Sequence, residues 1–90
     1  MNVVKRDCEL QKFDKQKIYN AIYKAMKASG NVKPKIAECI ANEIEQIAVD
    51  ADDDLSVSDI EELVFDKLIS KRQRLTARAY EDYRAVREFQ

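Results

Sequence analysis

Residues 3–18 read Val3-Val4-Lys5-Arg6-Asp7-Cys8-Glu9-Leu10-Gln11-Lys12-Phe13-Asp14-Lys15-Gln16-Lys17-Ile18. Apolar stretches on both sides of the turn-forming Asp7 predict a β-hairpin of Asn2–Lys5 and Glu9–Lys12. Asp14 is a typical helix N-cap, and apolar residues recur after it at helical spacing. These residues are Ile18, Ala21, Ile22, Ala25 and Met26. The segment therefore predicts a hairpin that leads directly into a helix, and Gly30 is suited to end that helix in a left-handed conformation.

Three more helices are predicted after Gly30. The second begins near Pro34, which suits a first helical turn, and closes in the acidic loop 50–54. The third begins at Ser56, since Ser56 with Asp59 forms a capping-box pattern and Leu55 with Ile60 a hydrophobic staple; a short strand at 55–57 would also fit. The fourth follows the basic stretch 71–74. Expected core positions of these helices include Ile36, Ile40, Ile44, Ile47, Ala48, Leu63, Val64, Leu68, Leu75, Ala79, Tyr83 and Val86.

Composition argues against several classes of protein. Histidine, the commonest general base and metal ligand, is absent, so the chain by itself is not expected to be an enzyme. Cys8 and Cys39 are too few for a disulfide framework or a zinc site, which favours a reducing, cytoplasmic location. No apolar run approaches the roughly 20 residues of a membrane span, and no signal-peptide pattern is expected at the start.

The charge is unevenly distributed although its sum is only −1. Residues 1–35 carry nine Lys/Arg and three Asp/Glu, residues 36–66 carry eleven acids and no base, and residues 67–90 carry seven bases and three acids. One interpretation is that the basic ends neutralise the acidic middle across helix faces. The other is that both basic ends converge on one bound anion.

Three bases around the hairpin and the first helical turn would suit a polyphosphate. Lys5 and Arg6 flank the turn, and Lys17 lies where free backbone N–H groups already favour an anion. Asp14 could act only as an N-cap, or its carboxylate could also accept a bond from the amine of an adenine. The residues alone indicate an anion site and leave its ligand open.

Four segments together resemble the ATP-cone domain. They are Val-Val-Lys-Arg-Asp at 3–7, Phe-Asp-x-x-Lys-Ile at 13–18, Val-x-Asp-Ile-Glu-x-Leu-Val at 57–64 and Ala-Arg-Ala-Tyr-x-x-Tyr-Arg at 77–84. The last segment most closely resembles the cone of anaerobic, class III ribonucleotide reductases. A related cone in the repressor of reductase genes follows a zinc ribbon, and this sequence lacks four zinc ligands.

The resemblance implies an α+β, mainly α fold, in which a four-helix bundle is capped by a small two- or three-stranded β-sheet. Residues 1–90 would form a single regulatory domain, excised from or appended to a larger protein. ATP or dATP, with Mg²⁺, would be its allosteric ligand. The implied partners are the catalytic domain or subunit of a ribonucleotide reductase, the parent ribonucleoside-triphosphate reductase, and a second copy in self-association. Membrane and nucleic acid are not expected as partners.

The resemblance also implies nucleotide-binding roles by position. Val3, Gln11 and Asp14 would surround the adenine. Lys5, Arg6 and Lys17 would meet the phosphates. Val57 and Glu61 would lie by the ribose and the phosphate entrance, and Arg84 or Arg87 would close the site.

Two positions depart from the family pattern. Cys8 stands where the family usually has Gly, and a non-Gly residue at positive φ costs on the order of 1 kcal/mol. Val57 stands where some members place a hydroxyl near phosphate. Both departures predict a weaker nucleotide site rather than a different fold.

Three other functions fit parts of the sequence. Asp50, Asp52, Asp54, Ser58 and Glu61 match ligand positions of an EF-hand calcium loop, although Leu55 replaces its required Gly. The basic stretch 71–74 could contact DNA, although the acidic middle and a pI near 5.5 argue against it. A ligand-free interaction domain is the third alternative.

Overall fold

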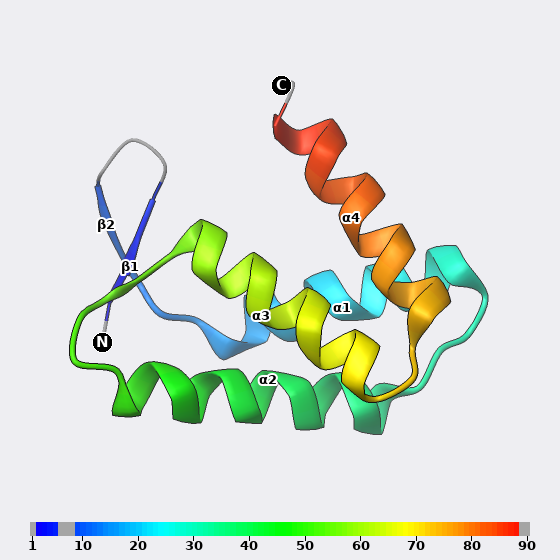
Figure 1. Cartoon of the computed structure of the whole chain (residues 1–90), viewed down its shortest axis with the longest axis horizontal. Coiled ribbons are helices and arrows are strands. Elements are labelled where there is room, and N and C mark those ends of the chain that lie inside the picture. Colours follow the sequence, from blue (N-terminus) through cyan, green and yellow to red (C-terminus); the bar gives the residue numbers. More distant parts are fainter. Residues whose placement is uncertain (1, 6–8, 89–90) are drawn as a thin grey trace.

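The computed structural model describes residues 2–5 and 9–88, with side chains described as far as Arg84. Four helices and a small mixed sheet make up the fold, which confirms the predicted fold class (Figure 1). The elements in chain order are β1 (Asn2–Val4), β2 (Leu10–Lys12), α1 (Lys15–Ser29), α2 (Pro34–Asp50), β3 (Leu55–Ser56), α3 (Val57–Ser70) and α4 (Arg74–Glu88).

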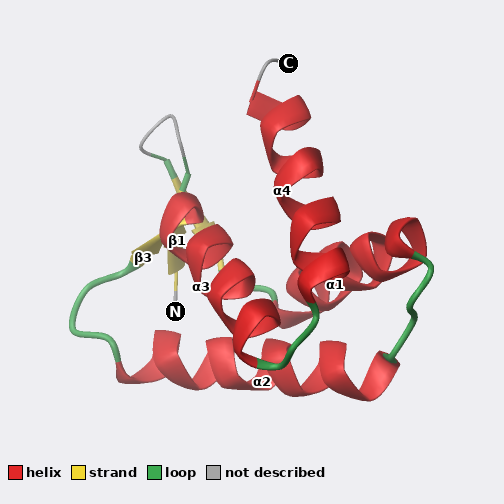
Figure 2. Ribbon diagram, turned by 45° about the vertical axis from the view of Figure 1, so that its right-hand side comes forward, coloured by secondary structure: helices red, strands yellow, loops and turns green. Residues whose placement is uncertain are grey.

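The sheet has the order β2-β1-β3 and lies at one end of the helices (Figure 2). β1 pairs antiparallel with β2, and the backbone N–H of Lys5 donates to the carbonyl of Glu9 at 2.8 Å just beyond the strands. β1 also pairs in parallel with β3, with Val3 opposite Leu55. The hairpin and the optional third strand are therefore confirmed, although the predicted turn at 6–8, including Cys8, lies outside the described residues.

Helix α1 begins and ends where its capping residues predict. The Asp14 carboxylate accepts a hydrogen bond from the backbone N–H of Gln16 at 2.9 Å, which satisfies one of the free donors of the first turn. Gly30 takes a left-handed conformation with φ of 79°, and its N–H bonds to the carbonyl of Lys27. The local sequence thus fixes the direction in which the chain enters and leaves α1.

Helix α3 begins with a complete capping box. The Ser56 hydroxyl accepts from the N–H of Asp59 at 3.0 Å, and the Asp59 carboxylate accepts from the N–H of Ser56 at 3.1 Å. Because Ser56 is also the last residue of β3, the box connects the sheet to the helix without a loop.

The core lies between the helices and extends under β1. Ile22, Met26, Ile40, Ile44, Val64 and Leu68 are its largest fully buried apolar side chains. Val3 and Phe13, from the hairpin and the segment after it, are also buried. The hairpin is therefore attached to the bundle by apolar packing as well as by pairing with β3.

The prediction for α4 is wrong for Leu75 and Tyr83, whereas Ala79 is partly buried against the core as predicted. Leu75 is 67% exposed and Tyr83 is 49% exposed, whereas Thr76 and Tyr80 are buried. Val86, which was predicted on the same stripe, lies beyond the described side chains. The buried side chains at this end of the chain are Gln73, Thr76, Ala77 and Tyr80.

Hydrogen bonds from the end of α1 explain this choice of face. The Thr76 hydroxyl lies 3.1 Å from the Ser29 hydroxyl, and Asn31 Nδ2 donates to Gln73 Oε1 at 3.2 Å. Both Thr76 and Gln73 are buried, and a buried polar group is tolerated when it has a partner. These bonds join residues more than 40 positions apart, so the periodicity of α4 could not reveal them.

Ion pairs join the basic ends of the chain to its acidic middle. Lys15 lies 3.7 Å from Glu45, and Lys67 and Lys71 lie 3.8 Å and 3.3 Å from the two oxygens of Glu43. Hydrogen bonding to the Glu43 carboxylate raises the pKa of Lys71 above its ordinary value of 10.5. Exposed pairs of this kind contribute about 0.2–1 kcal/mol each. Neutralisation across helix faces thus accounts for part of the charge pattern.

Candidate functional site

A cavity of about 180 Å³ lies where the sheet meets α1, α3 and α4. Its apolar lining comes from Val3, Phe13, Ile18, Ala21, Val57, Ile60 and Val64. Its polar lining comes from Gln11, Lys12, Asp14, Lys17, Glu61 and Tyr80. Sites that enclose a whole drug-sized ligand are larger, roughly 300–1,000 Å³. This cavity can therefore enclose one ring system and leave the rest of a longer ligand at its mouth.

The sheet side of the cavity provides an apolar surface with polar groups beside it. Val3 and Phe13 line the cavity with apolar side chains, and a planar ring could pack against them. The Gln11 amide on β2 and the exposed Asp14 carboxylate lie next to this surface. An amide and a carboxylate can both accept from an exocyclic amine, which gives the ring a preferred edge.

The start of α1 forms the positive side of the cavity. Lys17 is the third residue of the helix, and its exposed side chain contributes to the lining. The helix dipole places about half a positive charge at this end, where the Asp14 carboxylate caps the helix and no acidic residue lies within the first turn. Lys12 adds a second ammonium from β2. An anionic group at this side of the cavity would meet two lysines and a helix N-terminus.

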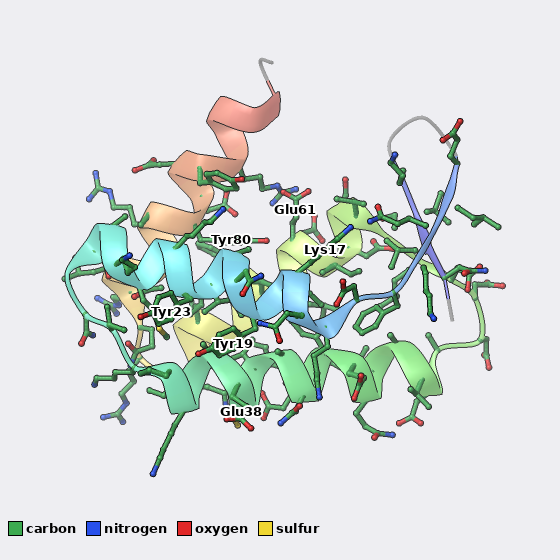
Figure 3. All side chains as sticks on the ribbon, turned by 180° about the vertical axis from the view of Figure 1, so that it is seen from behind. Lys17, Tyr19, Tyr23, Glu38, Glu61 and Tyr80 are labelled. Atoms are coloured by element: carbon green, nitrogen blue, oxygen red, sulfur yellow. The ribbon has the colours of Figure 1, made fainter. Side chains whose placement is uncertain are left out.

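A buried acidic residue faces this positive region. The side chain of Glu61 is 5% exposed, and its Oε2 lies 3.2 Å from the Nε of Arg84 on α4. Figure 3 shows Lys17, Glu61 and Tyr80 on the same side of the bundle, away from Glu38 on α2. A buried carboxylate is stable only when it is paired, so Arg84 is part of the site although it does not line the cavity.

This geometry agrees with a comparison to protein families. Residues 1–89 match the family model described as ATP cone domain. The chain belongs to the ATP cone domain family. A comparison with curated proteins finds no match. ATP cone domains are in general allosteric, nucleotide-binding regulatory domains, and the fold described above is the ATP-cone fold.

Within this ATP cone, the structure gathers most of the residues that the sequence predicts for the nucleotide site. Six of them line the cavity: Val3, Gln11, Asp14, Lys17, Val57 and Glu61. Lys5 is exposed just beyond β1 and is not part of the described lining. Arg6 lies outside the described residues. The roles of all eight in nucleotide binding stay predictions.

Sequence reasoning missed several lining residues of the cone. Ile18, Ala21 and Val64 were interpreted only as helix core and Ile60 only as part of a hydrophobic staple, and their spacing does give those signals. Lys12 carried no signal of its own, and Phe13 and Tyr80 appeared only as members of the quoted family segments. Phe13 could have been found from its place directly before the N-cap, where the chain must turn from the sheet into α1.

The residues of the calcium alternative do not come together. Asp50 is the last residue of α2, and Leu55 belongs to a strand rather than to the sharp turn of a calcium loop. Glu61 turns into the cavity and pairs with Arg84. Among residues 2–5 and 9–88 no group of three acidic, Cys or His side chains could hold a metal ion.

Two of the four residues in the basic stretch 71–74 are engaged within the protein. Lys71 is engaged by Glu43, and Gln73 is buried. Arg72 and Arg74 are exposed, but they flank this buried glutamine at the turn between α3 and α4.

In the described part of the chain, no helix is both long and apolar enough to cross a bilayer.

Proposed function

We propose that this cone binds ATP or dATP in the cavity between the sheet and the helices, and that binding regulates a ribonucleotide reductase. The resemblance of residues 77–84 to the class III enzymes favours an anaerobic ribonucleoside-triphosphate reductase as the regulated protein. The observation that carries the proposal is the convergence of six predicted residues on one cavity. That cavity combines an apolar surface with a cationic helix start.

The proposed pose follows from the two sides of the cavity. The adenine packs on Val3 and Phe13, with its amine toward Gln11 and Asp14. The triphosphate leaves the cavity along Lys17, where each oxyanion gains charge-assisted hydrogen bonds. The hairpin residues Lys5 and Arg6 approach the outer phosphates. Mg²⁺ comes with the phosphates and needs few protein ligands.

The remaining parts of the proposal concern the protein that the cone controls. Residues 1–90 act as one regulatory domain in the cytoplasm, without catalytic activity of their own. The partner is the catalytic domain or subunit of the reductase, and the nucleotide changes either its activity or the association of its subunits. By linkage, the state that the nucleotide favours must bind the nucleotide more tightly.

Calorimetric titration of the chain with ATP, dATP and GTP tests the ligand. We expect micromolar affinity for ATP and dATP, which corresponds to roughly 8 kcal/mol, and much weaker binding of GTP. Equal affinity for GTP would remove the proposed contacts of the adenine amine. Replacing both Lys5 and Arg6 by Ala should abolish binding and leave helicity unchanged.

Lys17 provides a sharper test because α1 offers a matched control. Lys17→Gln should weaken ATP binding about 10- to 100-fold, since it removes a charge-assisted bond worth about 1.5–3 kcal/mol. Lys24→Gln removes the same charge from an exposed position of α1 that is not part of the described lining. Equal losses in both variants would mean that general attraction, and not this site, holds the nucleotide.

A further inference from the structure

The ion pair of Glu61 and Arg84 joins two helices at the edge of the cavity. Glu61 Oε2 on α3 lies 3.2 Å from Arg84 Nε on α4, and the two side chains are only 5% and 19% exposed. A second nitrogen of the same guanidinium, Nη1, lies 3.3 Å from Glu81 Oε1. Arg84 thus meets two carboxylates, of which Glu61 lines the cavity and Glu81 does not.

Arg84, the α4 member of the pair, lies in the outer half of this helix. Thr76 and Tyr80 are buried and anchor the first half of the helix. Past Tyr80 the described side chains are at least partly exposed, and α4 projects from the bundle (Figure 1). The pair with Glu61 therefore links the outer half of α4 to α3.

A polyanion in the cavity would compete with Glu61 for the Arg84 guanidinium. A guanidinium binds phosphate as well as carboxylate, and a triphosphate offers more negative charge than a single Glu side chain. The greater charge of the phosphates therefore favours movement of the Arg84 guanidinium from Glu61 toward the ligand, against the cost of leaving the Glu61 carboxylate unpaired.

We propose that Arg84 exchanges its Glu61 partner for the phosphates of the bound nucleotide, and that this exchange transmits occupancy of the cavity to α4. The inference rests on the proposed nucleotide-binding function. In the empty cavity, Arg84 holds α4 against α3. In the occupied cavity, the guanidinium follows the phosphates, and the attachment of α4 to α3 is replaced by an attachment to the ligand.

A double-mutant cycle with two ligands tests the exchange. Calorimetry gives the affinities of wild type, Glu61→Gln, Arg84→Gln and the double variant for ATP and for adenosine, which lacks the phosphates. We expect Glu61→Gln to tighten ATP binding about tenfold, because the competitor for Arg84 is removed, and Arg84→Gln to weaken it about tenfold. The gain from Glu61→Gln should disappear in the Arg84→Gln background. For adenosine, the effects of the two substitutions should be additive, with no coupling between them.

Glu81→Gln is the matched control, since Glu81 also contacts Arg84 but lies outside the cavity lining. Its ATP affinity should stay within about twofold of wild type. The NMR signal of the Arg84 side-chain N–H should shift on addition of ATP, and Glu61→Gln should shift it without ATP. If Arg84→Gln does not fold, Arg84→Lys replaces it in the cycle, because Lys keeps the charge but loses the fork geometry.

The outcomes separate the two proposals. If the wild type binds ATP and Glu61→Gln weakens that binding, the exchange is overturned, since Glu61 would then hold the nucleotide directly. A gain that persists unchanged without Arg84 also overturns it, because Glu61 would act by repulsion alone. Wild type that binds no ATP overturns the proposed function, and the exchange with it.

Discussion

Replacing Asp14 by Ser should separate the two roles that this residue can have. Asp14 Oδ1 caps α1 by accepting from the N–H of Gln16 at 2.9 Å, and the same side chain contributes to the cavity lining. Ser is as good an N-cap as Asp, but its hydroxyl is shorter and uncharged. The substitution therefore keeps the cap and removes the acceptor offered to the adenine amine.

The expected magnitudes differ for the two roles. With the cap kept, Asp14→Ser should change the free energy of unfolding by less than about 0.5 kcal/mol, whereas Asp14→Ala should lower it by about 1 kcal/mol. For a 90-residue domain, about 1 kcal/mol corresponds to a fall in Tm of roughly 4–8 °C. The lost acceptor is exposed, so we take the low end of a charge-assisted bond, about 1.5 kcal/mol, or tenfold in ATP affinity.

Thermal unfolding followed by circular dichroism and calorimetry with ATP and GTP measure these two quantities. The difference in affinity between ATP and GTP should also become smaller in Asp14→Ser, because guanine presents a carbonyl oxygen where adenine presents an amine. Unchanged ATP affinity and unchanged discrimination would refute the ligand role and leave Asp14 as a cap alone. A Tm as low as that of Asp14→Ala would refute the cap argument instead.

The remaining predictions concern stability. Gly30→Ala should lower the free energy of unfolding by about 1 kcal/mol in a denaturant titration, because φ is 79° and an added Cβ meets no atom within 4 Å, so only the backbone penalty remains. Arg72→Gly should raise it by about 0.5–1 kcal/mol, since Arg72 has φ of 62° without being Gly. Leu75→Gln should change it by less than about 0.5 kcal/mol, because Leu75 is 67% exposed, and a loss of several kcal/mol would mean that the α4 face is buried after all. The Glu43 carboxylate raises the pKa of Lys71, so the stability lost in Lys71→Met should be constant from neutral pH up to 10.5 and should vanish as pH rises through the higher folded pKa. If the wild type and Lys71→Met still differ by the same free energy of unfolding above this range, the pairing is contradicted.

The parts of the fold that could be predicted are those encoded by neighbouring residues. The caps at Asp14 and Gly30 and the box of Ser56 with Asp59 use bonds that span two to four positions. Such bonds form in any structure that contains the local segment, so a motif of a few residues is sufficient to locate them. The hairpin and the helix boundaries followed from the same signals.

The buried face of α4 could not be predicted, because partners distant in the sequence decide it. Leu75 and Tyr83 form the more apolar stripe, yet Thr76 and Gln73 are buried where Ser29 and Asn31 satisfy them. The periodicity of a helix indicates how apolar each of its faces is, but it does not indicate which hydrogen-bond partners a face will meet in the folded protein.

The candidate site was predictable only where a family motif marks it. Composition and spacing led to an anion site of unknown ligand, and the resemblance supplied Val3, Gln11 and Val57, which look like ordinary hairpin and helix residues. The pairing of Glu61 with Arg84 joins α3 to α4 across 23 positions, and nothing in either helix alone indicates it.

The hairpin that lines the cavity is joined to the rest of the molecule by a short strand pairing and by the packing of Val3 and Phe13. β3 holds β1 over only two residue pairs, and Val3 is the buried side chain of that strand. Segments with so few attachments detach at a lower free energy than the whole domain, while the helices stay packed. We therefore expect the sheet to open locally at a lower free energy than the bundle unfolds, which would let a ligand enter or leave the cavity while the helices stay packed.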